Sequence, residues 1–409
     1  MYLLGEKQDG SYDDAATILS NPSMWSDACA QIFFSIGVCM GVMTSYASYN
    51  PVNQDIIGTA CQVAFGNSLF SFFAGFAVFS TVGYVQAMIP TLADQIASIG
   101  LAFVTYPAAI NQMPGSNFWA FLLSFCLFCL GIDSAFSLVE AVSTVVTDTP
   151  TFKQTPRKLI ALVICAVGAA FSTLFTFNWG FTYFDVVDHY LAVYLMLLLG
   201  IFQAFGTAWI YKWDEAVAAS NARSVYVLFF GYWIPHLILA ILGAWEFIPL
   251  IWCIVAFWAW MIVVYIVSWL LSGLAFGEWV RKVMFFGIDS LATSISALSY
   301  DEGAPRPWWA SVFEIWWGFS IKYVFSWACW FLVMLSLKSD LATNEDGEII
   351  GYGGYHMFWQ WMGFVYPIGG LLCFIIPAIL CTTKEEYEHD VEAALKGRVE
   401  AEMADKTKQ

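Results

Sequence analysis

The distribution of hydrophobic and polar positions divides this chain into nine long apolar stretches separated by shorter polar segments. Each stretch is long enough to cross about 30 Å of hydrocarbon as an α-helix. The stretches are residues 28–49, 64–89, 117–145, 158–178, 187–211, 224–245, 247–272, 315–337 and 355–381. This pattern predicts an all-α fold, a polytopic bundle of transmembrane helices in a lipid bilayer.

The polar segments between the spans differ in character. The sixth and seventh spans are separated only by the neighbourhood of Trp245-Glu246-Phe247, which predicts a tight hairpin. Residues 274–314 alternate charged and apolar positions, a pattern typical of interfacial helix and loop. Residues 384–409 predict a charged, helix-like tail.

Composition supports this class of protein. The chain has 409 residues, of which 60% are hydrophobic and only 12% are charged, against about 25% charged residues in a typical soluble domain. These values exclude a soluble enzyme, a disordered chain, a collagen and a secreted disulfide scaffold. The net charge of −16 excludes a general affinity for nucleic acid, which needs a basic surface. No nucleophile–base set and no metal cluster is visible, so an enzyme is not expected.

Basic residues predict the orientation. If the N-terminus lies outside and nine spans alternate, 14 of the 16 basic residues fall inside, all except Lys7 and Lys338. This distribution follows the positive-inside rule, and the reversed topology violates it. The C-terminus is therefore expected in the cytoplasm, and the plasma membrane is the expected location.

Two features of the spans suggest chemistry at membrane depth. Gly37 and Gly41 interrupt the first span, which indicates either close helix packing or an unwound helix whose free carbonyls bind a cation or substrate. Asp133 lies in the middle of the third span. A structural salt bridge is one interpretation, but no Lys or Arg lies inside the first five spans, which favours Na⁺ or a proton.

Other polar groups share helix faces. Gln31 and Ser35 lie four residues apart in the first span, as do Asn67 and Ser71 in the second. Their neutral donors suit an anion, although polar pairs in membranes also bond one another across packed helices. Asp188, at the start of the fifth span, is either an ordinary acidic helix start or a gate residue.

Several motifs in order resemble one family, the neurotransmitter:sodium symporters. The stretch Trp25-Ser26-Asp27-Ala28-Cys29-Ala30-Gln31-Ile32-Phe33-Phe34-Ser35-Ile36-Gly37 resembles the start of its sixth transmembrane helix. Similarity continues through Tyr46–Asn50, Ala74–Ser80, Gly100–Pro107 and Gly131–Ser134. It is dense over residues 25–150 and thinner to about residue 213.

The resemblance implies a domain organisation. The chain would carry helices 6 to 12 of the family, the second half of an inverted-repeat fold, with two extra spans. The implied segments are 1–24, a remnant of an extracellular loop; 25–213, helices 6 to 10; 214–273, two inserted spans; 274–314, a cytoplasmic or interfacial segment; 315–383, the last two spans; and 384–409, a cytoplasmic tail. A missing N-terminal half or an oligomeric partner is expected to complete the molecule.

The resemblance also implies binding sites. The sodium sites would use Ser35, Asn67, Leu130, Asp133 and Ser134. The chloride site would use Gln31, Ser35, Asn67 and Ser71, where the neutral Ser71 replaces a carboxylate of chloride-independent relatives. The substrate pocket would use Phe34, Ser35, Gly37, Met40, Ser134 and Leu138, and Asp188 would be the outer gate.

Together these observations predict a sodium-coupled, chloride-dependent symporter of amino acids or related small amines, in N-terminally truncated form, with no organic cofactor. Leu138 and Ala135 favour a small-to-medium amino acid as substrate. One departure is Val38-Cys39-Met40, where many members have Pro-Gly-Phe. The alternative is a membrane scaffold or regulatory subunit that keeps the second repeat and transports nothing.

Overall fold

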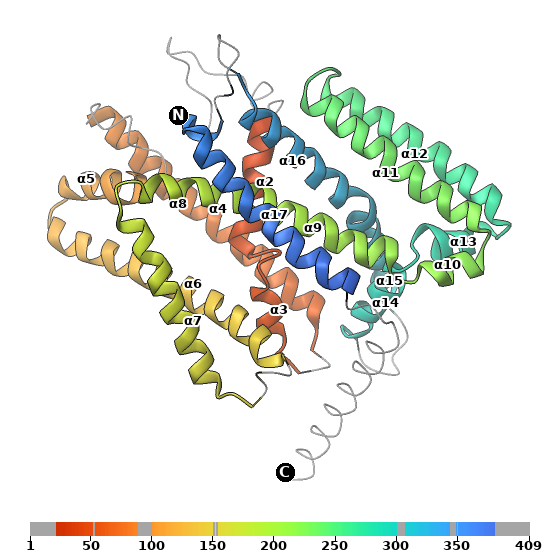
Figure 1. The fold of residues 1–409 in the computed structure, drawn as a ribbon, viewed down its shortest axis with the longest axis horizontal. Coiled ribbons are helices and arrows are strands. Elements are labelled where there is room, and N and C mark those ends of the chain that lie inside the picture. The colour runs from red at the N-terminus through yellow and green to blue at the C-terminus, as the bar shows by residue number, and fades with distance from the viewer. Residues whose placement is uncertain are drawn as a thin grey trace.

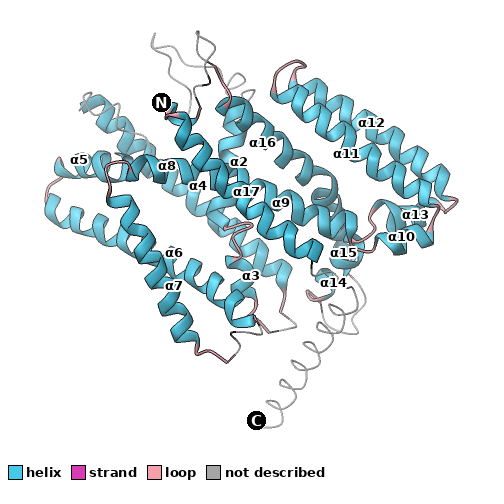
Figure 2. Ribbon diagram, viewed as in Figure 1, coloured by secondary structure: helices cyan, strands magenta, loops and turns pink. Residues whose placement is uncertain are grey.

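The computed structural model describes residues 22–51, 54–88, 100–149, 152, 154–300, 307–343, 349 and 351–380. In these segments the protein consists of helices joined by turns and loops, and the one β-structure described is an isolated β-bridge between Thr343 and Ile349 (Figure 2). The fold is therefore all-α and polytopic, as predicted. Figure 1 labels the α-helices.

The helices follow one another along the whole described chain. The first half contains α2 (Pro22–Ile36), α3 (Val42–Ala47), α4 (Ile56–Met88), η3 (Leu101–Thr105), α5 (Tyr106–Asn111), α6 (Ser116–Asp148), α7 (Arg157–Ser172), η4 (Thr173–Thr176), α8 (Gly180–His189), η5 (Tyr190–Leu195), α9 (Met196–Phe205), η6 (Gly206–Ile210) and α10 (Trp213–Ala219). The second half contains α11 (Ala222–Ala244), α12 (Leu250–Ser272), α13 (Phe276–Trp279), η7 (Val280–Met284), α14 (Ile288–Ala297), α15 (Trp308–Phe319), η8 (Ser320–Phe325), α16 (Ser326–Asp340), η9 (Tyr352–Gly354) and α17 (Met357–Leu380).

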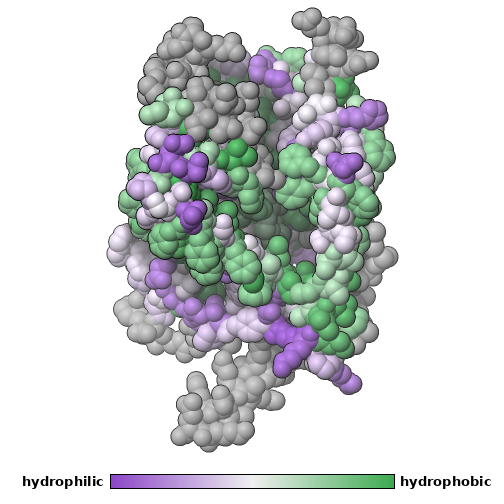
Figure 3. Space-filling view, turned by 90° about the vertical axis from the view of Figure 1, so that its left-hand side faces the viewer, coloured by the Kyte–Doolittle hydropathy of each residue, from purple (hydrophilic) through white to green (hydrophobic). Residues whose placement is uncertain are grey.

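Seven helical stretches in the described part are long and apolar enough to cross a membrane. They are Ile56–Val85, Ser116–Asp148, Arg157–Thr176, Gly180–Ala219, Ala222–Ala244, Leu250–Ser272 and Trp308–Asp340. The remaining two predicted spans correspond to α2 with α3, which are separated by a break, and to α17. Figure 3 shows apolar side chains over the middle of one face and hydrophilic ones toward its two ends, as expected for membrane helices.

The boundaries differ from the sequence prediction at several places. The second span begins at Ile56 rather than at residue 64, and the fifth extends from Gly180 to Ala219. In the predicted interfacial segment 274–314, short helices α13, η7 and α14 are followed by α15, which already begins at Trp308. Residues 384–409, and residues 1–21 of the predicted loop, lie outside the described residues.

Close contacts between small and large residues hold the second half together. Helices α11 and α12 pack as a hairpin, seen at the right of Figure 1, where Gly231 faces the Val264 side chain. Buried Ser224 and Ser268 exchange hydrogen bonds across the hairpin. Helix α17 contacts η5, and a Cβ at Gly370 would lie 2.5 Å from a Leu195 methyl carbon. These contacts join α11 to α12 and α17 to η5.

Candidate functional site

The first predicted span is interrupted where the sequence contains its two glycines. Helix α2 ends at Ile36 and α3 begins at Val42. Between them Gly37, Cys39 and Gly41 have φ angles of 72°, 64° and 77°, in the left-handed region that favours glycine. The helix is thus unwound between Ile36 and Val42. The Gly37 and Gly41 carbonyls still accept backbone hydrogen bonds, whereas among the described residues those of Val38, Cys39 and Met40 accept none.

The unwound segment lies against α9. The Cys39 sulfur is 3.7 Å from the Gln203 Oε1 atom, and a Cβ on Gly200 would lie 3.4 Å from the same sulfur. Because Gly200 leaves room for Cys39, the break is held at a defined place on the bundle. Two polar groups, from α9 and the unwound segment, meet there.

The structure brings together Ser35 and Asn67, two of the predicted ion ligands. The Ser35 hydroxyl donates to the Asn67 Oδ1 atom at 2.9 Å, which links α2 to α4. The Asn67 amide N–H groups then remain available as donors. Gln31 and Ser71 are exposed, and within the described residues no hydrogen bond involves the side chain of either.

The predicted ligands of α6 lie on an open surface. The Ser134 hydroxyl donates to the Leu130 carbonyl at 3.2 Å, so these two are adjacent. Asp133 and Ser134 are both exposed. Within the part of the chain that the structure describes, the Asp133 carboxylate makes no hydrogen bond or ion pair. The salt bridge considered from the sequence is therefore not present there.

The predicted substrate residues are also open to the surroundings. Phe34 and Leu138 are 55% and 52% exposed, and Met40 is half-buried. The neighbour of Phe34, Phe33, instead stacks on Phe325 with ring centres 5.8 Å apart. The α2 helix is thus anchored by Phe33 while Phe34 stays uncovered.

The exposure of this face is a property of whole helices. No residue is buried in the most apolar 18-residue stretch of α6, and 11% are buried in that of α4, against 50% in the Trp308–Asp340 span. A carboxylate at bilayer depth is costly unless protein, ion or water surrounds it. Among the described residues, the Asp133 face is therefore open.

A polar cluster that the sequence analysis did not assemble joins α3, α6 and α7. The Tyr49 hydroxyl donates to the Glu140 carboxylate, and Arg157 pairs with the same Glu140 Oε1 atom at 3.0 Å. Arg157 also donates to Thr144 at 2.9 Å, and Thr144 contacts buried Ser45 at 2.9 Å. This cluster ties the end of the broken span to α6. The signal in the sequence was Glu140, an acid in an apolar run.

A second network surrounds the predicted gate residue. Asp340 is 7% exposed and lies 2.8 Å from His189 Nε2 and 2.6 Å from the Tyr194 hydroxyl. Asp185 accepts hydrogen bonds from Tyr352 and Tyr355 at 3.2 and 2.9 Å.

These hydrogen bonds distinguish the two aspartates of α8, Asp185 and Asp188. Burial, and then the Asp185 charge, raise the pKa of Tyr352, so its hydroxyl remains a donor. Asp188 is exposed and has no hydrogen bond or ion pair with the described residues. Of the two aspartates, Asp188 is therefore the one available to a mobile partner.

The described residues thus form an all-helical fold in which several helices are long and apolar enough to span a membrane and one polar span is broken. A profile of the Sodium:neurotransmitter symporter family matches residues 13–300, and the chain belongs to that family. The match includes the α11–α12 hairpin.

Relatives with assigned names are consistent with the family. The chain is 34% identical over 198 residues to the human sodium- and chloride-dependent neutral and basic amino acid transporter B(0+), covering 48% of this chain and 31% of that protein. It is 35% identical over 222 residues to an uncharacterized sodium-dependent transporter of Methanocaldococcus jannaschii, covering 54% and 44%. It is 36% identical over 203 residues to the sodium- and chloride-dependent taurine transporter of Rattus norvegicus, covering 48% and 33%. The chain thus matches less than half the length of each of these relatives.

Proposed function

We propose that this chain is part of a sodium-coupled, chloride-dependent secondary active symporter of amino acids or related small amines. The observation that carries the proposal is the helix broken at Gly37–Gly41 beside the Ser35–Asn67 pair. Free backbone carbonyls at such a break, with a nearby hydroxyl and amide, supply the oxygen ligands that Na⁺ needs. The names of the relatives, which include amino acid and taurine transporters, agree with this assignment.

Two sodium sites are proposed from these residues. Ser35 and Asn67 would contribute to one, beside the break. The Leu130 carbonyl, the Asp133 carboxylate and Ser134 would form the other on α6. Each set is open on one side, so further ligands would come from the helices that cover this face.

The chloride site would lie along the facing sides of α2 and α4. With its Oδ1 atom engaged by Ser35, Asn67 would direct its N–H groups to the anion. Gln31 and Ser71 would add an amide and a hydroxyl. None of these four groups carries a charge, so Cl⁻ would supply the negative charge that balances co-transported Na⁺.

The substrate would bind between the break and α6, in contact with Phe34, Ser35, Gly37, Met40, Ser134 and Leu138. Asp188 would act as the outer gate because its carboxylate is not held by the neighbouring network, unlike that of Asp185. In this proposal the basic ends of the spans face the cytoplasm, the N-terminus lies outside, and the plasma membrane is the site of action.

The test is sodium-driven uptake in cells that express the transporter containing this chain. A panel of taurine, glycine, GABA and neutral and basic amino acids would be offered with sodium, and with sodium replaced by N-methylglucamine. The proposal predicts uptake of at least one of them that stops without sodium. A correctly inserted protein that takes up none of them would contradict the symporter and favour the scaffold alternative.

A further inference from the structure

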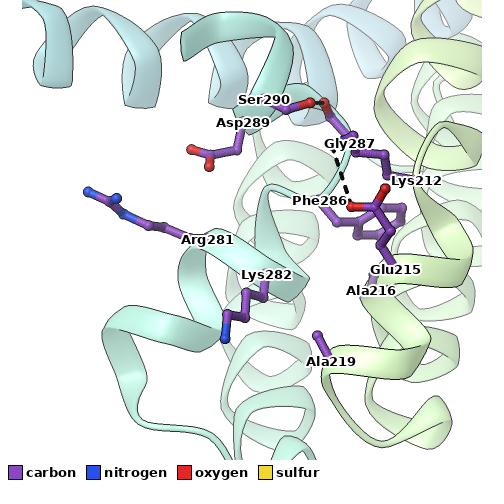
Figure 4. A pocket seen from close by; sticks show the side chains of 10 residues that line it. All are labelled: Lys212, Glu215, Ala216, Ala219, Arg281, Lys282, Phe286, Gly287, Asp289 and Ser290. Carbon is purple, nitrogen blue, oxygen red and sulfur yellow. Dashed lines mark hydrogen bonds and ion pairs between the residues drawn. The ribbon is translucent and has the colours of Figure 1, made fainter.

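A charged cavity lies outside the proposed transport site, at the end of the Gly180–Ala219 span (Figure 4). Its volume is about 280 Å³. The cavity lies between α10 and the turn that joins η7 to α14, so segments about 70 residues apart in the sequence form it. Its lining residues are Lys212, Glu215, Ala216, Ala219, Arg281, Lys282, Phe286, Gly287, Asp289 and Ser290.

Backbone features hold the cavity open. The long helix changes direction at Lys212, whose φ of 59° is in the left-handed region. On the other side, Gly287 has a φ of 76°, and a Cβ there would lie 2.6 Å from the Tyr211 carbonyl oxygen. Only glycine permits this approach of the two backbones. Phe286 is 4% exposed, and its carbonyl accepts a 3.2 Å hydrogen bond from buried Lys322. The floor of the cavity is therefore fixed.

Some charged side chains around the cavity form ion pairs with described residues, and others do not. Lys212 pairs with Glu215 at 3.4 Å. Arg281 and Lys282 are exposed, and among the described residues neither side chain forms a hydrogen bond or ion pair. In Figure 4 both extend from η7 away from the Lys212–Glu215 pair. Two positive groups at the cavity mouth are thus free to bind an anion.

The helix that precedes the cavity segment in sequence, α12, has features typical of a membrane-spanning helix. Helix α12 ends at Ser272, eight residues before η7, and Trp269 near its end donates to the Leu274 carbonyl at 3.1 Å. Tryptophan at a helix end is typical of the level of lipid headgroups. Along α12, Ile262, Ile266 and Leu270 are 59%, 49% and 70% exposed. Because they are spaced four residues apart, these three side chains form one apolar stripe on α12, which runs toward the end of the helix that precedes η7.

We propose that this cavity binds the phosphate-bearing headgroup of an anionic membrane lipid, with its acyl chains lying along the exposed stripe of α12. Arg281 and Lys282 contact the phosphate, since a guanidinium and an ammonium are the usual protein partners of phosphate oxygens. The apolar stripe distinguishes a lipid from a soluble anion, because only a lipid gains from covering it. Basic pockets beside transmembrane helices are a recurrent form of lipid recognition.

The test compares lipids by native mass spectrometry of the purified full chain. The probes are phosphatidylglycerol, neutral phosphatidylcholine, and glycerol 3-phosphate as the soluble arm. Phosphatidylglycerol is expected to bind at least tenfold more tightly than either of the others. If glycerol 3-phosphate binds as tightly as phosphatidylglycerol, the cavity is a site for soluble phosphate compounds and the lipid proposal is wrong. If phosphatidylcholine binds as tightly, the cavity does not recognise an anionic headgroup.

Variants locate the binding. The double variant Arg281→Gln/Lys282→Gln is expected to lose at least tenfold in phosphatidylglycerol affinity. The matched control Lys158→Gln/Arg223→Gln removes the same charge from exposed residues outside the cavity and is expected to change affinity less than twofold. Equal losses in both would mean general charge attraction and overturn the proposal. The single variants Arg281→Gln and Lys282→Gln give an independent readout if the double variant does not fold, and wild-type affinity in both would also overturn it.

Discussion

At the scale of single residues, Ser71 is the proposed chloride ligand at which the balance of charge can be changed by substitution. Its hydroxyl is exposed and unbonded among the described residues, one helical turn from Asn67. In the transporter that contains this chain, Ser71→Glu would supply a fixed negative charge where Cl⁻ is proposed to bind. Uptake by the variant should then remain at half or more of its value when chloride is replaced by gluconate, while the parent stops.

The neutral variant Ser71→Gln is the matched control, since it adds similar volume without charge. It should remain as dependent on chloride as the parent. Unchanged uptake by the parent when chloride is replaced, or equal chloride dependence of the Ser71→Glu variant, would show that these residues do not form a chloride site.

The sequence alone predicted candidate site residues within single spans, but not their hydrogen-bond partners from distant parts of the chain. Ser35 and Asn67 were assigned from helical spacing and family resemblance, and the structure places them 2.9 Å apart. The network of His189 with Asp340, and of Asp185 with Tyr352, joins residues more than 150 positions apart. No periodicity within one span contains that information, so the sequence left Asp188 as either an ordinary acidic helix start or a gate residue.

At the scale of elements, the turn at Gly287, between η7 and α14, packs against Tyr211 of the long fifth span. Gly287→Ala should lower the melting temperature of the purified protein, because a side chain there meets the Tyr211 carbonyl and is strained at positive φ. A left-handed non-glycine residue alone costs about 1–3 kcal/mol. The control is Gly277→Ala, where a Cβ meets nothing within 4 Å. Equal melting temperatures in the two variants would show that the close approach has no energetic weight.

A second junction connects α4 and α14 and should respond to pH. The Ser299 hydroxyl donates to Asp55 at 2.5 Å and the Gly58 N–H at 3.0 Å, and these bonds lower the pKa of Asp55 below its usual value of 3.8. A lowered pKa in the folded state means that the stabilisation is present above the ordinary pKa and is lost as pH falls through the lowered one.

Ser299→Ala should therefore lower the melting temperature at pH 7, and the difference from wild type should shrink as pH falls below the ordinary aspartate range. The effect should be small, since Asp55 is exposed. A difference that stays constant with pH would mean that Ser299 acts by packing and not through the ionised carboxylate.

The spans were predictable as elements because length and hydropathy are strong signals in a membrane protein. The ends of the spans were harder to predict. Asp55 caps the first turn of α4 through the Gly58 N–H. Polar Thr59 and Gln62 interrupt the apolar pattern there, so the sequence pattern did not predict that the helix begins at Ile56. The break in the first span was one of two alternatives, because glycine pairs also serve close packing.

At the scale of the whole molecule, the bundle is unevenly packed. Helices α9, α11 and α16 contribute to buried cores, whereas the most apolar stretches of α4 and α6 are almost entirely unburied. Composition predicted the membrane class, and motifs predicted the family. The packing of the α11–α12 hairpin on α16 depends on side-chain fit between distant segments, which a single sequence does not show.

We propose that Asp133 binds Na⁺ on the open face of α6, so removing its charge should change the sodium dependence of uptake. In the transporter that contains this chain, Asp133→Asn would be compared with Glu278→Gln, an exposed acid of α13, with membrane amounts measured for both. Asp133→Asn is expected to abolish uptake or to raise the half-saturating sodium concentration at least tenfold, while Glu278→Gln should match wild type. Unchanged sodium dependence in a normally expressed Asp133→Asn protein would contradict it.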